Sequence, residues 1–493
     1  MATSTGIRFS SAPGRWVLLA TVLGSGMALL DSTVVNVALP SIGKDLGGGV
    51  AGLQWVVTAY LITLSSLILL GGSLGDLFGR RRIFLIGTVW FSAASVLCAA
   101  APTLGMLIAA RAVQGVGGAL LTPGSLAIIE ASFVPEDRNR AIGAWSGLGG
   151  VATAIGPFVG GWLVSAVSWR LIFLLNLPLA ATVLLASRHV PESSDPGSGH
   201  QVDGLGAALA AIGLAALTYA LIEGPSGTAN AAVTVLSALI GVAALFGFFV
   251  VERGSRHPML PLDIFRSRQF TAANLVTFAV YAALGGVFFL LAVYLQQALH
   301  YSPVEAGAAL FPLTVIMLLL SARAGELSQR IGPRLPMTLG PVIVGLGLLL
   351  MVRIRPGAHY VSTVLPAVIV FGLGLSLTVA PLTATVLAAV DQRHAGVASG
   401  VNNAVARVAG LLAVAILPAL AGISGADYQN ASVFTAGFHT AVVISAGLTF
   451  AGALVAFAGI RNPAREDPQL AACGTGRSCP VSGPPLRHLP ADR

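Results

Sequence analysis

Fourteen long apolar runs, separated by short polar segments, limit what this chain can fold into more than any other feature. The runs lie near residues 16–38, 52–72, 83–101, 104–128, 140–166, 170–187, 204–222, 231–251, 271–294, 305–322, 336–352, 362–388, 398–421 and 436–460. An α-helix needs about 20 apolar residues to cross the hydrocarbon core of a bilayer. A membrane β-barrel would instead alternate apolar and polar residues at every second position. The sequence therefore predicts an all-α integral membrane protein with fourteen transmembrane helices.

The composition agrees with this class and excludes several others. Of the 493 residues, 55% are hydrophobic and only 9% are charged, whereas about 25% are charged in an average soluble protein. So little polar surface cannot cover a soluble fold, which argues against a soluble enzyme, a disordered chain and a nucleic-acid-binding domain. Because neither a Walker loop, a His-rich metal set nor a nucleophile elbow is present, we expect no enzymatic activity and no metal site. The expected partner is the lipid bilayer.

The arginine distribution predicts how the chain is oriented in the membrane. With the N-terminus in the cytoplasm, 21 of the 27 basic residues fall in cytoplasmic segments and four fall in outer loops. Cytoplasmic loops carry the excess of Lys and Arg, so both termini are expected to be cytoplasmic, which requires an even number of spans. The near absence of lysine (Lys44 is the only one) suggests a GC-rich genome. We expect a multi-pass protein of a bacterial inner membrane.

A faint internal repeat predicts how the spans are grouped. The segments 72–81 and 325–334 share Gly, Leu, Gly and Arg at a constant offset of 253 residues. Eight predicted spans separate them, which fits two six-helix bundles with two extra helices between them (6+2+6), and repeats of this kind are typical of secondary transporters. The expected units are an N-terminal bundle, a cytoplasmic linker, two additional helices, a cytoplasmic loop, a C-terminal bundle and a disordered tail, at 1–187, 188–203, 204–252, 253–270, 271–460 and 461–493.

Four short segments carry a family resemblance. They are Leu30–Pro40 in the first span, Gly72–Arg82 after the second, Arg111–Gly118 in the fourth and Gly156–Gly161 in the fifth. In this order and at these places they resemble the motifs of the major facilitator superfamily, and within it the fourteen-span drug:proton antiporter family. The resemblance covers nearly the whole chain. It implies export of lipophilic drugs or antibiotics by alternating access, with protons as the coupling ion and no other cofactor. A small lipophilic substrate and a monomeric protein are expected.

Asp31 and Arg111 are the candidate proton-coupling residues. A carboxylate inside a span is a functional candidate, because the low dielectric of the membrane lets it take and release protons near neutral pH. A buried guanidinium needs a partner, and Asp31 is the acid nearest to Arg111 in predicted depth. The alternative is a permanent pair that serves packing alone. Val368 occupies the matching position in the second half, which favours a functional role for Arg111.

The loop after the second span is a candidate conformational latch. Gly75 and Gly79 would permit a tight turn. Asp76 could cap a helix N-terminus and pair with Arg80 or Arg81, holding the two bundles in one state. The alternative for the arginines is that they only determine topology.

The fifth span holds a candidate antiporter hinge. Pro157 removes a backbone hydrogen bond and kinks a helix, while Gly156, Gly160 and Gly161 allow a neighbouring helix to approach closely. The functional interpretation is a hinge or a seal against leak, and the alternative is an ordinary proline kink.

Three polar residues within spans, Asn36, Gln114 and Arg407, are candidates for the wall of a substrate cavity. For Arg407 the alternative is that it snorkels to the interface or pairs with a loop acid. Two other transport functions stay open: a narrow-specificity metabolite exporter and a proton-coupled importer of the same fold. A membrane receptor or sensor would bind a ligand without flux, but no segment of the sequence reads as a signalling domain.

Overall fold

The computed structural model describes residues 6–194, 203–226, 229–255, 258, 260–390, 395–424, 427 and 430–462. Within these ranges it is helical and holds no β-strand beyond an isolated backbone bridge between Ile7 and Phe133. The helices are α1 (Ala12–Leu46), α2 (Val50–Phe78), α3 (Arg80–Ala100), α4 (Leu104–Ser132), α5 (Pro135–Ala166), α6 (Leu171–Leu174), α7 (Asn176–Ala186), α8 (Gly204–Ser226), α9 (Ala231–Gly254), α10 (Arg268–Gln297), α11 (Pro303–Ala309), α12 (Phe311–Ile331), α13 (Arg334–Met351), α14 (Leu365–Ala388), α15 (Ala395–Leu420) and α16 (Ala431–Gly459). The expected flexible linker and disordered tail fall largely on residues 195–202 and 463–493, outside the described part.

The helices agree with the predicted membrane spans. Thirteen helical segments of the described chain are long and apolar enough to cross a bilayer; α6 with α7 forms one of them, and α11 with α12 another. The remaining long helix, α5, contributes the shorter apolar segment Ile155–Ala166. The order of these elements matches the fourteen predicted runs.

The first helix is longer than its apolar run predicts. α1 continues past residue 38 through Pro40 to Leu46, and it ends at Gly47 and Gly48, whose φ angles are +75° and +120°. Only glycine adopts such angles readily, so the glycine pair and not the proline ends the helix.

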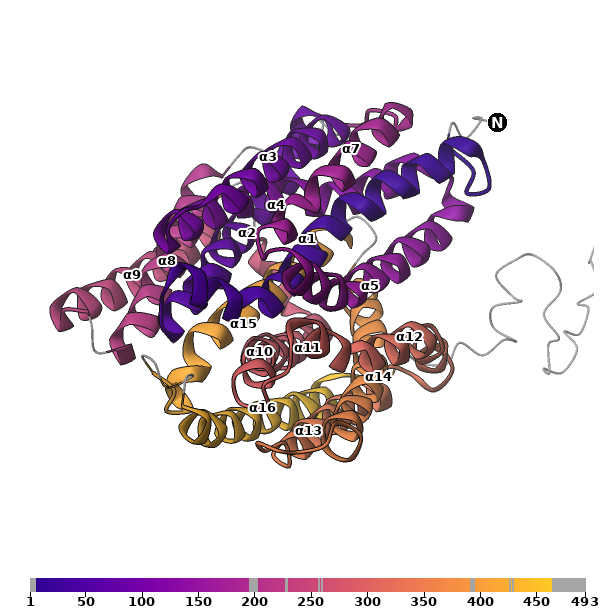
Figure 1. Cartoon of the computed structure of the whole chain (residues 1–493). Helices are drawn as coiled ribbons and strands as arrows, with labels where there is room; N and C mark the ends of the chain where they lie inside the picture. Colours follow the sequence, from indigo (N-terminus) through magenta and orange to yellow (C-terminus); the bar gives the residue numbers. More distant parts are fainter. Residues whose placement is uncertain are drawn as a thin grey trace, which may run out of the picture.

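The helices gather into two halves (Figure 1). In the first, α4 packs on α2 and α3, and α1 packs on α5 and α7; in the second, α10 packs on α15 and α16, and α13 on α14 and α16. α8 and α9 pack on each other beside the first half, and α8 also contacts α2 and α15. This arrangement agrees with the predicted order of six, two and six spans.

The internal repeat appears as two matching helix junctions. Gly79 between α2 and α3 has φ +104°, and Gly332 between α12 and α13 has φ +87°. The backbone N–H of Arg81 donates to the Glu192 carboxylate at 3.0 Å, and that of Arg334 donates to Asn462 Oδ1 at 3.1 Å. In each half, a polar side chain that follows the last helix of the bundle therefore accepts a hydrogen bond from a backbone N–H in the first turn of an earlier helix, α3 or α13.

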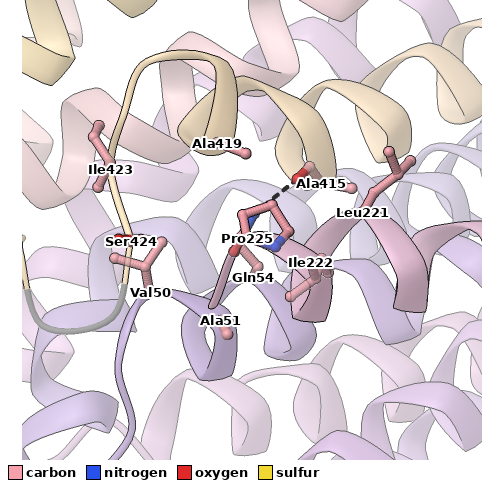
Figure 2. A pocket seen from close by; sticks show the side chains of 10 residues that line it. All are labelled: Val50, Ala51, Gln54, Leu221, Ile222, Pro225, Ala415, Ala419, Ile423 and Ser424. Atoms are coloured by element: carbon pink, nitrogen blue, oxygen red, sulfur yellow. Dashed lines mark hydrogen bonds between the residues drawn. The ribbon is translucent and has the colours of Figure 1, made fainter. Parts of the chain in front are cut away.

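The two halves meet at the end of the molecule where α1 ends and α2 begins. Figure 2 shows Gln54 of α2 beside Pro225 of α8 and Ala415 of α15. Gln54 Nε2 donates to the backbone carbonyls of Val414 and Ala415 at 2.7 and 3.1 Å. Because Pro418 has no N–H, the Val414 carbonyl lacks its usual partner in the helix, and Gln54 satisfies it.

Candidate functional site

A buried ion pair joins the first and fourth helices. Arg111 Nη1 of α4 donates to Asp31 Oδ2 of α1 at 2.6 Å, and each side chain keeps only 1% of its surface exposed. The sequence placed these residues at similar depth, and the structure brings them into contact. Since α1 and α4 pack directly on each other, the pair lies inside the first half of the molecule.

Gln114 binds both members of the pair. Its Oε1 accepts from Arg111 Nη1 at 2.6 Å, and its Nε2 donates to Asp31 Oδ1 at 2.9 Å. The two oxygens of Asp31 are therefore held by different donors, one charged and one neutral. Gln114 is fully buried and is part of this cluster; that it also lines a substrate cavity stays a prediction.

Ser95 and Asn176 complete the polar shell of Asp31, and sequence reasoning missed both. Gln114 Nε2 donates to Ser95 Oγ of α3 at 2.9 Å. Asn176 Nδ2 donates to the same hydroxyl at 3.1 Å and to Asp31 Oδ1 at 3.5 Å. A lone Ser or Asn in an apolar span is a weak signal. The proline two residues after Asn176, Pro178, marks the interruption between α6 and α7 and is the feature that could have drawn attention to it.

Arg111 is also held by the second helix. Its Nε donates to the Val56 carbonyl at 3.1 Å, and its guanidinium carbon lies 4.3 Å from the centre of the Tyr60 ring, a cation–π distance. Gly115, about one turn farther along α4, makes this approach possible. A Cβ there would collide with the Thr63 hydroxyl and the Tyr60 carbonyl of α2.

The surroundings of Asp31 can stabilise its negative charge, which protonation would remove. Four helices besides α1 supply groups around Asp31, and the buried charges compensate each other, which is the condition for keeping ions in a low dielectric. Protonation of Asp31 would neutralise the carboxylate and leave the Arg111 charge without its counter-ion. A change in the charge of Asp31 would therefore act on contacts among α1, α2, α3, α4 and α7.

The predicted latch has a different geometry from the one expected. Arg80 Nε donates to Asp76 Oδ1 at 2.8 Å within one helix junction, but Asp76 does not cap α3. Glu192 does so instead, as its carboxylate accepts from the N–H groups of Arg81 and Arg82. Of the two glycines, only Gly79 has a positive φ, because α2 runs through residue 75 to Phe78. The predicted loop is therefore a single-residue junction between two helices.

The predicted hinge residues lie where α5 packs on two neighbours. A Cβ on Gly156 would collide with Thr33, and a Cβ on Gly160 would approach Val34 Cγ1 to 2.6 Å, both on α1. On Gly161 it would collide with the Pro303 carbonyl at the start of α11. The Pro157 carbonyl meets α11 in the same way, because a Cβ on Gly307 would collide with it. The segment thus brings α5 into close contact with both halves.

The other two candidate cavity residues are not part of the cluster. Asn36 Nδ2 donates to the Ser32 carbonyl of its own helix at 3.3 Å, and its Oδ1 is buried without a partner among the described residues. Arg407 lies in the middle of α15, in the second half of the molecule. No group of three His, Cys, Asp or Glu side chains that could hold a metal ion occurs in the part of the chain described.

Comparison with known proteins agrees with this architecture. The model of the Major Facilitator Superfamily matches residues 21–414. The chain belongs to this superfamily. It is 38% identical over 410 residues to the puromycin resistance protein pur8 of Streptomyces alboniger, covering 82% of this chain and 81% of that protein. It is 36% identical to the methylenomycin A resistance protein of Bacillus subtilis (strain 168), covering 83% and 87%.

A solved structure supports the same fold. The human organic anion transporter MFSD10 superposes with a TM-score of 0.62, covering 90% of this chain and all of the other, at 19% sequence identity. At that identity the likeness concerns the fold alone. The family model and the two relatives confirm the superfamily predicted from the sequence motifs, and the chain is a multi-pass membrane transporter.

Proposed function

We propose that this transporter exports lipophilic drugs or antibiotics by alternating access, driven by the inward flow of protons. The observation that carries the proposal is the fully buried Asp31 with its charged and neutral donors, Arg111, Gln114 and Asn176. An ionisable residue at such a place inside a membrane bundle is costly and marks an ion or proton pathway. The names of the relatives, which describe resistance to puromycin and methylenomycin A, support export rather than uptake.

In this mechanism the proton changes the helix contacts around Asp31. When Asp31 is ionised, Arg111 and Gln114 hold α1 against α4. When Asp31 is protonated, that attraction weakens, while Arg111 keeps its bond to the Val56 carbonyl. A ligand or proton shifts the balance of two states only through its different affinity for them. The proton would bind with different affinity to the inward- and outward-facing states. Substrate would compete with the proton for binding.

The remaining motifs would transmit and limit the movement. The Asp76–Arg80 pair and the Gly79 junction fix the angle between α2 and α3. The close contact of Gly161 with α11 closes the halves on one side, which the arginine distribution assigns to the outside. By the same argument both termini lie in the cytoplasm of a bacterial cell. We further propose that the protein works as a monomer, with protons as the coupling ion and no other cofactor.

Dye efflux tests the proposal. Energised cells that express the wild-type chain are expected to extrude a lipophilic dye, and a protonophore is expected to abolish the extrusion. Asp31→Asn, which keeps the shape of the side chain but cannot ionise, should abolish it too. Efflux that resists the protonophore would contradict proton coupling. Absence of efflux for a broad panel of lipophilic compounds would instead favour a narrow metabolite exporter or an importer.

A further inference from the structure

Arg407 faces the first half of the molecule at mid-membrane depth. α2 and α15 run antiparallel in contact, with Gln54 bonded to the Val414 carbonyl near one end. Farther along, Leu69 Cδ2 lies 3.2 Å from the position that a Cβ on Gly400 would take. Residues 400, 407 and 414 are seven apart, nearly two helical turns, so they share one face of α15. Arg407 therefore points at α2 midway between these two contacts.

The aromatic residues near Arg407 come from both halves. Tyr60 of α2 and Tyr281 of α10 lie within electrostatic range of it. Tyr60 is the ring that also covers Arg111. One turn and a half nearer the start of α15, Asn402 Nδ2 donates to Thr277 Oγ1 of α10 at 2.7 Å and to Asn274 Oδ1 at 3.2 Å. The surroundings of Arg407 thus combine aromatic rings with neutral polar groups.

The charge of Arg407 has no counter-ion within the described residues. The ion pairs there join Arg80 to Asp76, Arg111 to Asp31 and Arg170 to Asp45. Every described acid other than Asp31 lies within two turns of a helix end or between helices. The one carboxylate at mid-membrane depth is thus already held by Arg111. Arg407 is half-buried, and its side chain forms no hydrogen bond in the described structure.

Snorkelling cannot relieve this charge. Arg407 is twelve residues from the first residue of α15 and thirteen from the last, which at 1.5 Å per residue is about 18 Å from either end. That distance is far beyond the length of an arginine side chain. A charge so deep in a membrane protein requires a partner.

We infer that Arg407 is the counter-ion for an acidic group on the exported compound, and that the substrates are lipophilic aromatic acids that carry a carboxylate or phenolate. The planar guanidinium binds a carboxylate through two parallel hydrogen bonds. The ring of Tyr281, which is only partly buried, would offer a flat surface to an aromatic skeleton. The inference rests on the proposed export function and assigns its substrate class.

A pair of dyes that differ only at the acid provides the test. Rhodamine B carries a free carboxylate, and its ethyl ester has the same rings with that charge removed. Binding of each dye to the purified full chain is measured by fluorescence anisotropy, and transport is measured in proteoliposomes with an imposed pH gradient. The variants are Arg407→Gln and Arg407→Lys. The control is Arg323→Gln, which removes an exposed arginine of α12.

The wild type and the control are expected to bind the acid roughly tenfold or more tightly than the ester, since a hydrogen bond to a charged group contributes that much affinity. Arg407→Gln should lose this preference and still bind the ester, and Arg407→Lys should keep part of it. Equal binding of acid and ester by the wild type, or an unchanged preference in Arg407→Gln, would overturn the inference while leaving proton-driven export intact. If a variant does not fold, the ratio of acid to ester affinity in the wild type still tests the inference. Dye binding without transport under a pH gradient would contradict the proposed function separately.

Discussion

At the scale of single residues, the site depends on a charge pair taken out of water. Arg111 contacts Asp31, Gln114 and the Val56 carbonyl, and all three contacts are buried. The attraction within such a pair roughly offsets the cost of removing both ions from water, whereas one ion left alone is strongly destabilising. The pair is therefore expected to behave as a unit in mutagenesis.

Arg111→Gln should destabilise the protein by about 3–5 kcal/mol, because it leaves the Asp31 carboxylate buried without its counter-ion. The double variant Asp31→Asn with Arg111→Gln should be more stable than Arg111→Gln alone. Thermal unfolding in detergent measures both effects. Arg170→Gln is the control, since it breaks an ion pair in which both side chains are substantially exposed, and it should change stability little. If the double variant were no more stable than Arg111→Gln, the two charges would not compensate each other.

The sequence predicts the ionised members of this site and misses the neutral ones. Asp31 and Arg111 are detectable because a charge inside an apolar run is rare and costly. Ser95 and Asn176 cost little in a span, so nothing in the pattern singles out Ser95, and only the nearby Pro178 distinguishes Asn176 from other polar residues there. Span depth does not reveal which way a side chain points, so the sequence does not predict that Gln114 binds both Asp31 and Arg111. For the same reason the sequence does not predict that Arg407 faces α2.

At the scale of helices, close backbone approaches determine how the two halves touch. α5 reaches α11 at Gly161 and at the Pro157 carbonyl, with no room for a further atom. The sequence predicts small residues at such a contact, but it does not identify the partner. The partner is α11, a helix of seven residues that begins at Pro303, and no apolar run announces it as a separate element.

Gly161→Ala should push α5 away from α11 and favour the conformation that is open on that side. A cysteine replacing Ala306, which is buried beside this contact, should then react several times faster with a membrane-impermeant maleimide applied from outside. The background lacks the three native cysteines. Gly143→Ala in the same helix is the matched control, because a Cβ there meets nothing within 4 Å. Equal labelling in the two glycine variants would show that the α5–α11 contact does not limit opening.

The junctions between helices show where sequence patterns stop being informative. The repeat at 72–81 and 325–334 predicts two equivalent features, and the structure supplies them at Gly79 and Gly332. The capping groups, Glu192 and Asn462, lie over a hundred residues away in sequence. They reach the first turns of α3 and α13 only when the end of each half folds against an earlier helix of the same half. The local sequence therefore predicts Asp76 as the cap instead.

At the scale of the whole molecule, hydrophobicity and arginine placement are the sequence features that predict the membrane topology. Runs long enough to cross the bilayer predict the helices, and the excess of arginine on alternate segments predicts their direction.

We expect green fluorescent protein to fluoresce when it is fused after Asn462, and alkaline phosphatase to be inactive there. Fusions within the segment between α1 and α2, residues 47–49, should give the opposite pattern. Phosphatase activity at the C-terminal fusion would contradict the assigned orientation and the even number of crossings.

The proposed transport cycle depends on one proton at one carboxylate, that of Asp31. Purified wild-type protein in a weakly buffered detergent solution, at a pH where Asp31 is protonated, should release protons when a transported dye is added, because substrate and proton compete. Asp31→Asn should still bind the dye and release none. The release is measured with a pH indicator and compared with dye binding on the same samples. Proton release by Asp31→Asn equal to that of the wild type would place the coupling site elsewhere and contradict the account.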